Sequence, residues 1–183
     1  MMKRILFSSL LLSFFMTVSA QEEKKIILLH TNDLHSRLNG FAPESEYSPY
    51  MTGNDRTKGG FARIAAIIKK EKRENPGLTL AVDAGDFLMG TLFQSLEVKT
   101  GFQLGLMQKM GYDLVCLGNH EFDFGTVKLA EIINRAGENG TIPPILSGNA
   151  DFSISDSGDD GLERSAGPSP LALASGRGAV HRR

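Results

Sequence analysis

Short apolar runs, each followed by turn-forming or polar residues, divide the chain into regular blocks. Runs with β-branched side chains and flanking Gly, Asn or Asp are typical of buried strands. Between them, apolar residues recur three or four positions apart, which is typical of amphipathic helices. We therefore predict strands at 26–30, 78–83, 114–117 and 145–147, and helices at 58–71, 91–110 and 126–136.

The resulting order, β-α-β-α-β-α-β, predicts an α/β fold with a sheet covered by helices. Gly101, after Thr100, is expected to break the second helix. His30 is expected to be a core histidine bonded to backbone. Each predicted helix is expected to bury an apolar face in the core. The residues are Phe61, Ile64, Ile67 and Ile68 in the first helix, Phe102, Leu104, Leu106 and Met107 in the second, and Val127, Leu129, Ile132 and Ile133 in the third.

Three of the predicted strands end in residues that can bind metal ions. Asp33 and His35 follow the first strand, Asp86 follows the second, and Asn119 and His120 follow the third. Ligands of open α/β sheets collect beyond the carboxyl ends of the strands. Carboxylate oxygen and imidazole nitrogen suit zinc, manganese or iron. The strand ends therefore form a candidate metal site, in which one aspartate could bridge two cations.

Each of these residues also has an ordinary structural explanation. Asp86 can cap the segment that follows it, and Asn-His-Glu after a strand can be a solvated turn. The imidazole of His120 can stack against Phe122 or Phe124. Alternatively, Asp123 can keep it protonated, so that it faces an anionic group. The coincidence of three such strand ends favours the metal site.

The first residues have the pattern of a signal peptide. Lys3 and Arg4 precede the apolar run 5–18, and small residues at 18–20 offer a cleavage site. The apolar run is shorter than the ~20 residues that a membrane-spanning helix needs. We therefore predict that residues 1–20 are removed and that no stable membrane anchor remains. The mature chain is then exported, to a periplasm or the extracellular medium.

From Ser153 onward the apolar periodicity stops, and Gly, Ser, Asp, Pro and Arg dominate. Such a composition does not bury a core. The segment 153–183 is therefore predicted to be disordered, or to result from a shifted reading frame after Asp151. The folded domain is predicted at 21–152, which fits the usual length of a single domain.

Composition narrows the functional classes. The 183 residues are 41% hydrophobic, enough to bury a core, and the formal net charge is −1. Such a charge gives no electrostatic reason to expect a nucleic-acid polymer or an anionic membrane as partner. Cys116, the single cysteine, lies inside a predicted strand and is expected to be a small buried apolar residue.

The three polar blocks, at 29–35, 83–86 and 118–123, resemble the signature blocks of the calcineurin-like metallophosphoesterases. More narrowly, they resemble the exported bacterial 5′-nucleotidase and UDP-sugar hydrolase branch, over roughly 26–151. The resemblance implies a partial metallophosphoesterase α/β sandwich, with an incomplete sheet and helices packed on it. It also implies two divalent metal ions (Zn, Mn, Mg, Ca or Fe) and a small-molecule nucleotide or other phosphoester as substrate.

The resemblance further implies a role for each polar residue. By position, the metal ligands would be Asp33, His35, Asp86 and Asn119. Asp86 would bridge both ions, and hydroxide would attack phosphorus in line. His120, oriented by Asp123, would stabilise negative charge on the phosphoryl oxygens or the leaving group.

The chain departs from the family pattern after the third block. Later histidine ligands are missing, since His181, the only later histidine, follows no strand. We expect an incomplete second metal site and weak activity. We also expect an exposed sheet edge and uncovered apolar faces, which invite aggregation. Alternatives to a 5′-nucleotidase are a 2′,3′-cyclic phosphodiesterase, a UDP-sugar hydrolase, and a non-catalytic exported module that binds one metal, or a partner through the loop 36–57.

Overall fold

A computed structural model describes residues 24–40, 58–147 and 161–162. Four parallel strands form one sheet in the order β1-β2-β3-β4, which is also their order in the sequence. The predicted strands are confirmed, with small shifts at their ends. Their bounds are Ile27–Thr31 for β1, Thr79–Asp83 for β2, Leu114–Cys116 for β3 and Ile145–Leu146 for β4.

The connections between the strands are helical, as predicted. The second helix is interrupted at Gly101, whose φ of 57° lies in the left-handed region. A Cβ at this glycine would collide with the backbone of Ile132 and Ala136, so the break also allows close helix packing. The helical elements are α2 (Phe61–Glu74), the 3-10 helix η1 (Leu92–Leu96), α3 (Glu97–Thr100), α4 (Phe102–Met110), the 3-10 helix η2 (His120–Phe122) and α5 (Thr126–Glu138).

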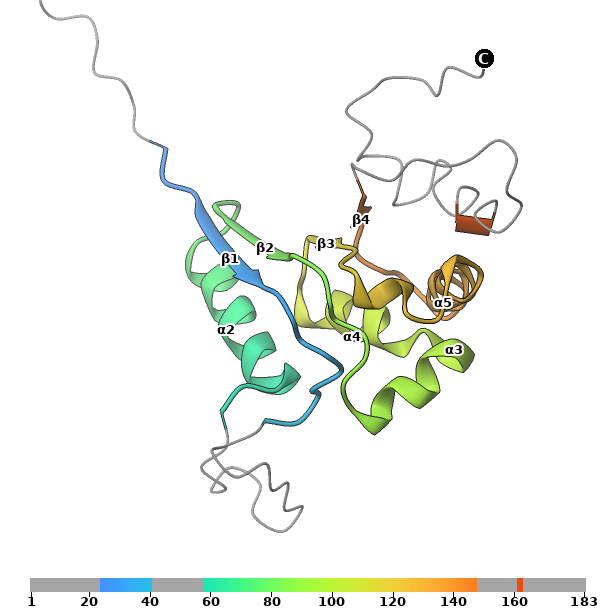
Figure 1. Ribbon diagram of the computed structural model, residues 1–183. Coiled ribbons are helices and arrows are strands. Elements are labelled where there is room, and N and C mark those ends of the chain that lie inside the picture. The colour runs from blue at the N-terminus through green and yellow to red at the C-terminus, as the bar shows by residue number, and fades with distance from the viewer. Residues whose placement is uncertain (1–23, 41–57, 148–160, 163–183) are drawn as a thin grey trace, which may run out of the picture.

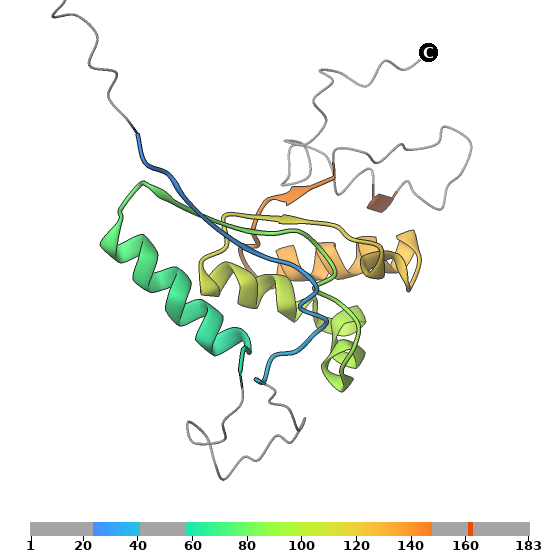
Figure 2. The same cartoon turned by 60° about the vertical axis from the view of Figure 1, so that its left-hand side comes forward.

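The helices α2, α4 and α5 cover one face of the sheet (Figure 2). Right-handed crossovers between strands that follow the sequence order place every helix on the same face. The buried core lies between this face and the helices. It contains Ala81, Val115 and Ile145 from the sheet, with Phe61, Ile68, Leu104, Met107, Leu129, Ile132 and Ile133 from the helices.

Three expectations about the core are wrong. His30 is exposed, because alternate residues of β1 point away from the helices and His30 lies on the helix-free side. Ile67 is 58% exposed, since it lies about 100° around α2 from the buried Ile68. Val127 is 53% exposed, because it lies about 200° around α5 from Leu129.

The opposite face of the sheet carries apolar side chains. Leu28 in β1 is 59% exposed and its partner in the register, Leu80 in β2, is 37% exposed. No helix of the described residues lies on this face, so the expected uncovered apolar face is confirmed for that part of the chain. Adjacent exposed leucines of this kind promote association between copies.

Several expectations fall outside the described residues. These are the signal peptide at 1–20, the region 41–57 of the first long loop, and most of the segment 153–183. Within that last segment Gly161 and Leu162 are described, and Leu162 is buried in the core cluster. Among the described residues, no helix is both long enough and apolar enough to span a bilayer.

Candidate metal centre

The loops that follow β1, β2 and β3 lie side by side at the carboxyl edge of the sheet (Figure 1). The first two are joined by backbone hydrogen bonds: the amide of Asp33 donates to the Gly85 carbonyl at 3.0 Å, and that of His35 to the Asp86 carbonyl at 2.9 Å. A Cβ on Gly85 would collide with the backbone of Gly118 in the third loop. Glycine at these positions therefore lets the loops approach closely enough to share ligands.

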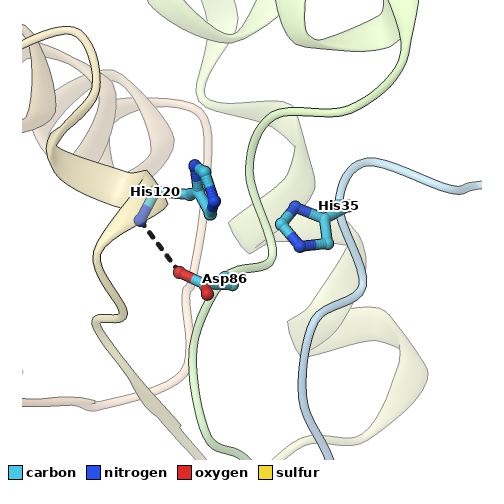
Figure 3. A group of neighbouring side chains, drawn as sticks. All are labelled: His35, Asp86 and His120. Atoms are coloured by element: carbon cyan, nitrogen blue, oxygen red, sulfur yellow. Dashed lines mark hydrogen bonds between the residues drawn. The ribbon is translucent and has the colours of Figure 1, made fainter.

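One side chain from each loop contributes to a common cluster. His35, Asp86 and His120 each offer a ligand atom, and these atoms lie within 4.8 Å of one another (Figure 3). The two imidazole rings meet edge to face, with centroids 5.0 Å apart and an interplanar angle of 71°. Two nitrogens and a carboxylate oxygen form a donor set that suits zinc, manganese or iron. The residues present therefore fit a divalent metal ion.

Backbone strain is concentrated in the same loops. Left-handed φ in a non-glycine residue costs of order 1–3 kcal/mol and persists only where the surroundings enforce it. In the described part of the chain, such residues are Asp33 (54°), His35 (48°), Ser36 (52°), Asp86 (59°) and Met89 (63°). All lie in the first two loops, and two belong to the cluster. This concentration of strain is typical of a functional site.

The sequence profile of the calcineurin-like phosphoesterase family matches residues 26–169. This chain belongs to that family. Both the predicted family and the predicted α/β fold class are confirmed, and the chain carries its candidate metal cluster within the three polar blocks at the strand ends.

Three similar proteins extend the comparison. A 5′-nucleotidase of Bos taurus is 37% identical over 126 residues, 68% of this chain and 20% of that protein. The crystal structure of a 5′-nucleotidase precursor from Thermus thermophilus superimposes with a TM-score of 0.54 at 29% identity, covering 71% of this chain and 23% of that one. The Haemophilus influenzae NAD nucleotidase gives a TM-score of 0.55 at 28% identity, with 72% and 22% covered. The chain thus spans about a fifth of the length of the curated relatives it matches.

Two predicted ligands lie outside the cluster of three. Asp33 is exposed, with its Oδ1 3.6 Å from Nε2 of His35, and its other oxygen accepts a hydrogen bond from Asn32. Asn119 is also exposed and directly precedes His120. The structure therefore places Asp33 beside His35. It also places His120 next to His35 and Asp86, although the sequence had not predicted His120 as a metal ligand.

His120 and Asp123 are paired as predicted. Nδ1 of His120 lies 2.7 Å from Oδ2 of Asp123, one turn further along η2. This hydrogen bond is the main cause that raises the pKa of His120 above its usual value, with smaller contributions from the charges of Asp123 and Asp86. Partial desolvation acts in the opposite direction. The pair therefore favours a protonated imidazole at the edge of the cluster.

Glu121 is a structural partner of the site that sequence reasoning missed. Its side chain is fully buried and accepts hydrogen bonds from three backbone amides. These belong to Asp86 (2.9 Å), Leu88 (2.9 Å) and Gly118 (2.6 Å), so one carboxylate ties the second loop to the third. The sequence does not show whether a glutamate is buried or exposed. The structural role of Glu121 therefore could not be predicted from the motif Asn-His-Glu.

Asp83 was also missed as a functional neighbour. It is buried at the end of β2, where its carboxylate accepts hydrogen bonds from the Thr31 hydroxyl (2.6 Å) and the Gly85 amide (3.0 Å). The Thr31 hydroxyl also lies 2.7 Å from the hydroxyl of Tyr112. Desolvation raises the pKa of Asp83 to about 6. This group joins the ends of β1 and β2.

Gly118 provides a steric test of the cluster. A Cβ at this position would collide with Oδ1 and the backbone nitrogen of Asp86. We expect Gly118→Ala to displace the Asp86 carboxylate and weaken Mn²⁺ binding at least about tenfold, measured by calorimetric titration. Gly137→Ala is the matched control, because no atom lies within 4 Å of its Cβ and the helix α5 should gain up to about 1 kcal/mol of stability. Equal Mn²⁺ affinity in both variants would contradict the arrangement.

Proposed function

We propose that this chain hydrolyses nucleotides to nucleosides and phosphate, as a 5′-nucleotidase, with a divalent metal ion held by His35 and Asp86 and with a protonated His120 beside it. The observation that carries the proposal is the convergence of three ligand atoms within 4.8 Å, from three separate strand ends. The choice of a nucleotide as substrate is supported by the similarity to 5′-nucleotidases, in sequence at 37% identity and in structure at a TM-score of 0.54.

The division of labour follows from the positions of the side chains. His35 and Asp86 hold the metal, with Asp33 beside them, while Asn119 is proposed as a ligand of a second ion. A bound divalent ion supplies a Lewis acid that polarises phosphoryl oxygens and lowers the pKa of a water molecule. Nδ1 of His120 is hydrogen-bonded to Asp123. In the protonated imidazole, Nε2 can therefore donate a hydrogen bond to a phosphoryl oxygen or to the leaving oxygen.

The pairing of His120 with Asp123 gives a pH prediction. Because Asp123 raises the pKa of His120, the imidazole stays protonated to higher pH than a free histidine. In Asp123→Asn the pKa of His120 falls, so the alkaline limb of the pH–rate profile should move to lower pH. The profile for phosphate release measures this shift. An unchanged alkaline limb would show that protonated His120 does not limit the rate.

The activity itself is tested with the full chain and three substrates. AMP, 2′,3′-cyclic AMP and UDP-glucose are incubated with Mn²⁺, and the released phosphate and nucleoside products are measured. We expect AMP to be hydrolysed fastest, at a rate well below that of a full-length relative, because the described residues offer few nitrogen ligands for a second ion. Preference for the cyclic ester or the UDP-sugar would assign the corresponding alternative activity.

A non-catalytic role is the alternative from a different class. A module that binds one metal would take up a single Mn²⁺ and release no phosphate from any of the three substrates. We further propose that the mature chain acts outside the cytoplasm, because residues 1–20 have the charged, apolar and small-residue order of a signal peptide.

A further inference from the structure

A buried polar group lies behind the first metal-binding loop, formed by Ser36, Glu97 and Gln103. Each of these residues is at most 1% exposed, and they come from the loop after β1, from α3 and from α4. Nε2 of Gln103 donates to the Ser36 hydroxyl at 2.9 Å, and the backbone amide of Gln103 donates to Oε1 of Glu97 at 3.0 Å. The three residues thus form a chain of hydrogen bonds from the two helices to the loop.

Two atoms of this group lack a partner, Oε2 of Glu97 and Oε1 of Gln103. Buried polar atoms without a partner are costly and call for an explanation. The side chains of Glu97 and Gln103 interact, so a proton on Oε2 of Glu97, donated to Oε1 of Gln103, would satisfy both atoms. So would an inverted Gln103 amide, which donates to an ionised Glu97 and accepts from the Ser36 hydroxyl. In both arrangements Gln103 connects Glu97 to Ser36.

Both arrangements are accessible near neutral pH. Burial raises the pKa of Glu97 to about 7, and the hydrogen bonds from Gln103 partly oppose this shift. No charge of another described residue is among the causes of the shift, and the hydrogen bonds that contribute to it come from Gln103. The connection to Ser36 is therefore retained whether Glu97 is neutral or ionised.

Ser36 is the residue next to His35, and both have left-handed φ. The backbone of Ser36 is held by the Phe87 carbonyl (2.8 Å) and by the Thr91 hydroxyl (2.7 Å). The Ser36 side chain is held by Gln103. A change at Gln103 therefore acts on the conformation of the segment that carries the His35 imidazole.

We propose that Gln103 and Glu97 are positioning residues, which hold Ser36 and thereby keep the His35 imidazole beside Asp86 and His120. This inference rests on the proposed metal site, and it adds two residues from the helices that do not touch the ion. It accounts for a fully buried glutamate, glutamine and serine beside the apolar core.

Metal affinity in the full chain tests the proposal, measured by calorimetric titration with Mn²⁺. We expect Gln103→Leu to raise the Kd for Mn²⁺ at least about tenfold, because second-sphere partners typically contribute 10–100-fold to metal affinity. Met110→Ala is the matched control, since Met110 is buried at the far end of the same helix. It should lower the melting temperature and leave the Kd within about twofold of the wild-type value.

A pair of substitutions at Glu97 separates positioning from general destabilisation. Glu97→Gln can accept from the Gln103 amide and donate to Oε1 of Gln103, so it should keep the wild-type Kd at pH 6 and pH 8. Glu97→Leu cannot, and its Kd should rise about tenfold. Glu97→Gln should also be more stable than the wild type at pH 8 and equal to it below pH 4.5. The reason is that a raised folded-state pKa makes the wild-type chain lose stability as the pH rises through about 7.

The outcomes are distinct. A folded Gln103→Leu that binds Mn²⁺ as tightly as the wild type overturns the positioning role alone. So does an equal loss of affinity in Met110→Ala, or in Glu97→Gln and Glu97→Leu. A wild-type chain that binds Mn²⁺ but releases no phosphate overturns the proposed hydrolysis and leaves the positioning role supported. A wild-type chain that binds no Mn²⁺ overturns both.

Discussion

Asp86→Asn should abolish most of the metal affinity of the chain and, with it, the proposed release of phosphate from AMP. Asp86 provides the carboxylate of the cluster, and its Oδ1 also accepts the backbone amide of His120 at 2.9 Å. Loss of an outer partner of a metal ligand costs 10–100-fold in affinity, so loss of the charged ligand itself should cost at least about 100-fold. Calorimetric titration with Mn²⁺ and a phosphate-release assay measure the two effects.

The control for this prediction is Glu131→Gln. Glu131 is a surface carboxylate that pairs with Lys128 at 2.8 Å, with both side chains at least 40% exposed. A surface pair of this kind contributes little to stability, so the variant should bind Mn²⁺ like the wild type. If Asp86→Asn also retains wild-type affinity, the metal does not bind at the cluster.

Glu121→Leu should produce the largest loss of stability. The substitution leaves the amides of Asp86, Leu88 and Gly118 without their acceptor, the fully buried Glu121 carboxylate. Each buried donor left unsatisfied costs about 1–3 kcal/mol, so we expect a loss of about 3–5 kcal/mol. A domain is typically stable by only about 5–15 kcal/mol. Urea unfolding followed by circular dichroism measures the change.

Glu138→Gln serves as the control for Glu121, because Glu138 is exposed at the end of α5 and its replacement should change stability by less than about 0.5 kcal/mol. A similarly small change in Glu121→Leu would mean that the amides find other acceptors. In that case, a single buried carboxylate would not join the second and third loops.

The order of elements and the location of the site were predictable because both depend on local patterns. The spacing of apolar residues and the turn-forming residues between apolar runs locate the strands. Gly101 marks the break in the second helix. Polar residues directly after parallel strands must meet at one edge of the sheet, so His35 and Asp86 could be expected to lie close together. The pairing of His120 with Asp123 was predictable from a spacing of three residues on one helical turn.

The remaining features depend on three-dimensional packing. Whether Glu121 or Glu97 is buried depends on which loops and helices close over it, and neighbouring residues do not reveal this. His30 was expected in the core because it lies inside the first strand, whereas the described helices cover only one face of the sheet and His30 lies on the other. The left-handed backbone of Ser36 is held by hydrogen bonds with Phe87, Thr91 and Gln103, which lie more than fifty residues away in the sequence.

The account depends most on the strand ends converging on one metal ion, and a Co²⁺ titration of the full chain followed by visible absorption tests this directly. We predict saturable binding with absorption bands of a nitrogen- and oxygen-ligated ion, and loss of these bands in His35→Ala and in Asp86→Asn. Absence of saturable Co²⁺ binding in the folded chain, or wild-type spectra in both variants, would contradict it.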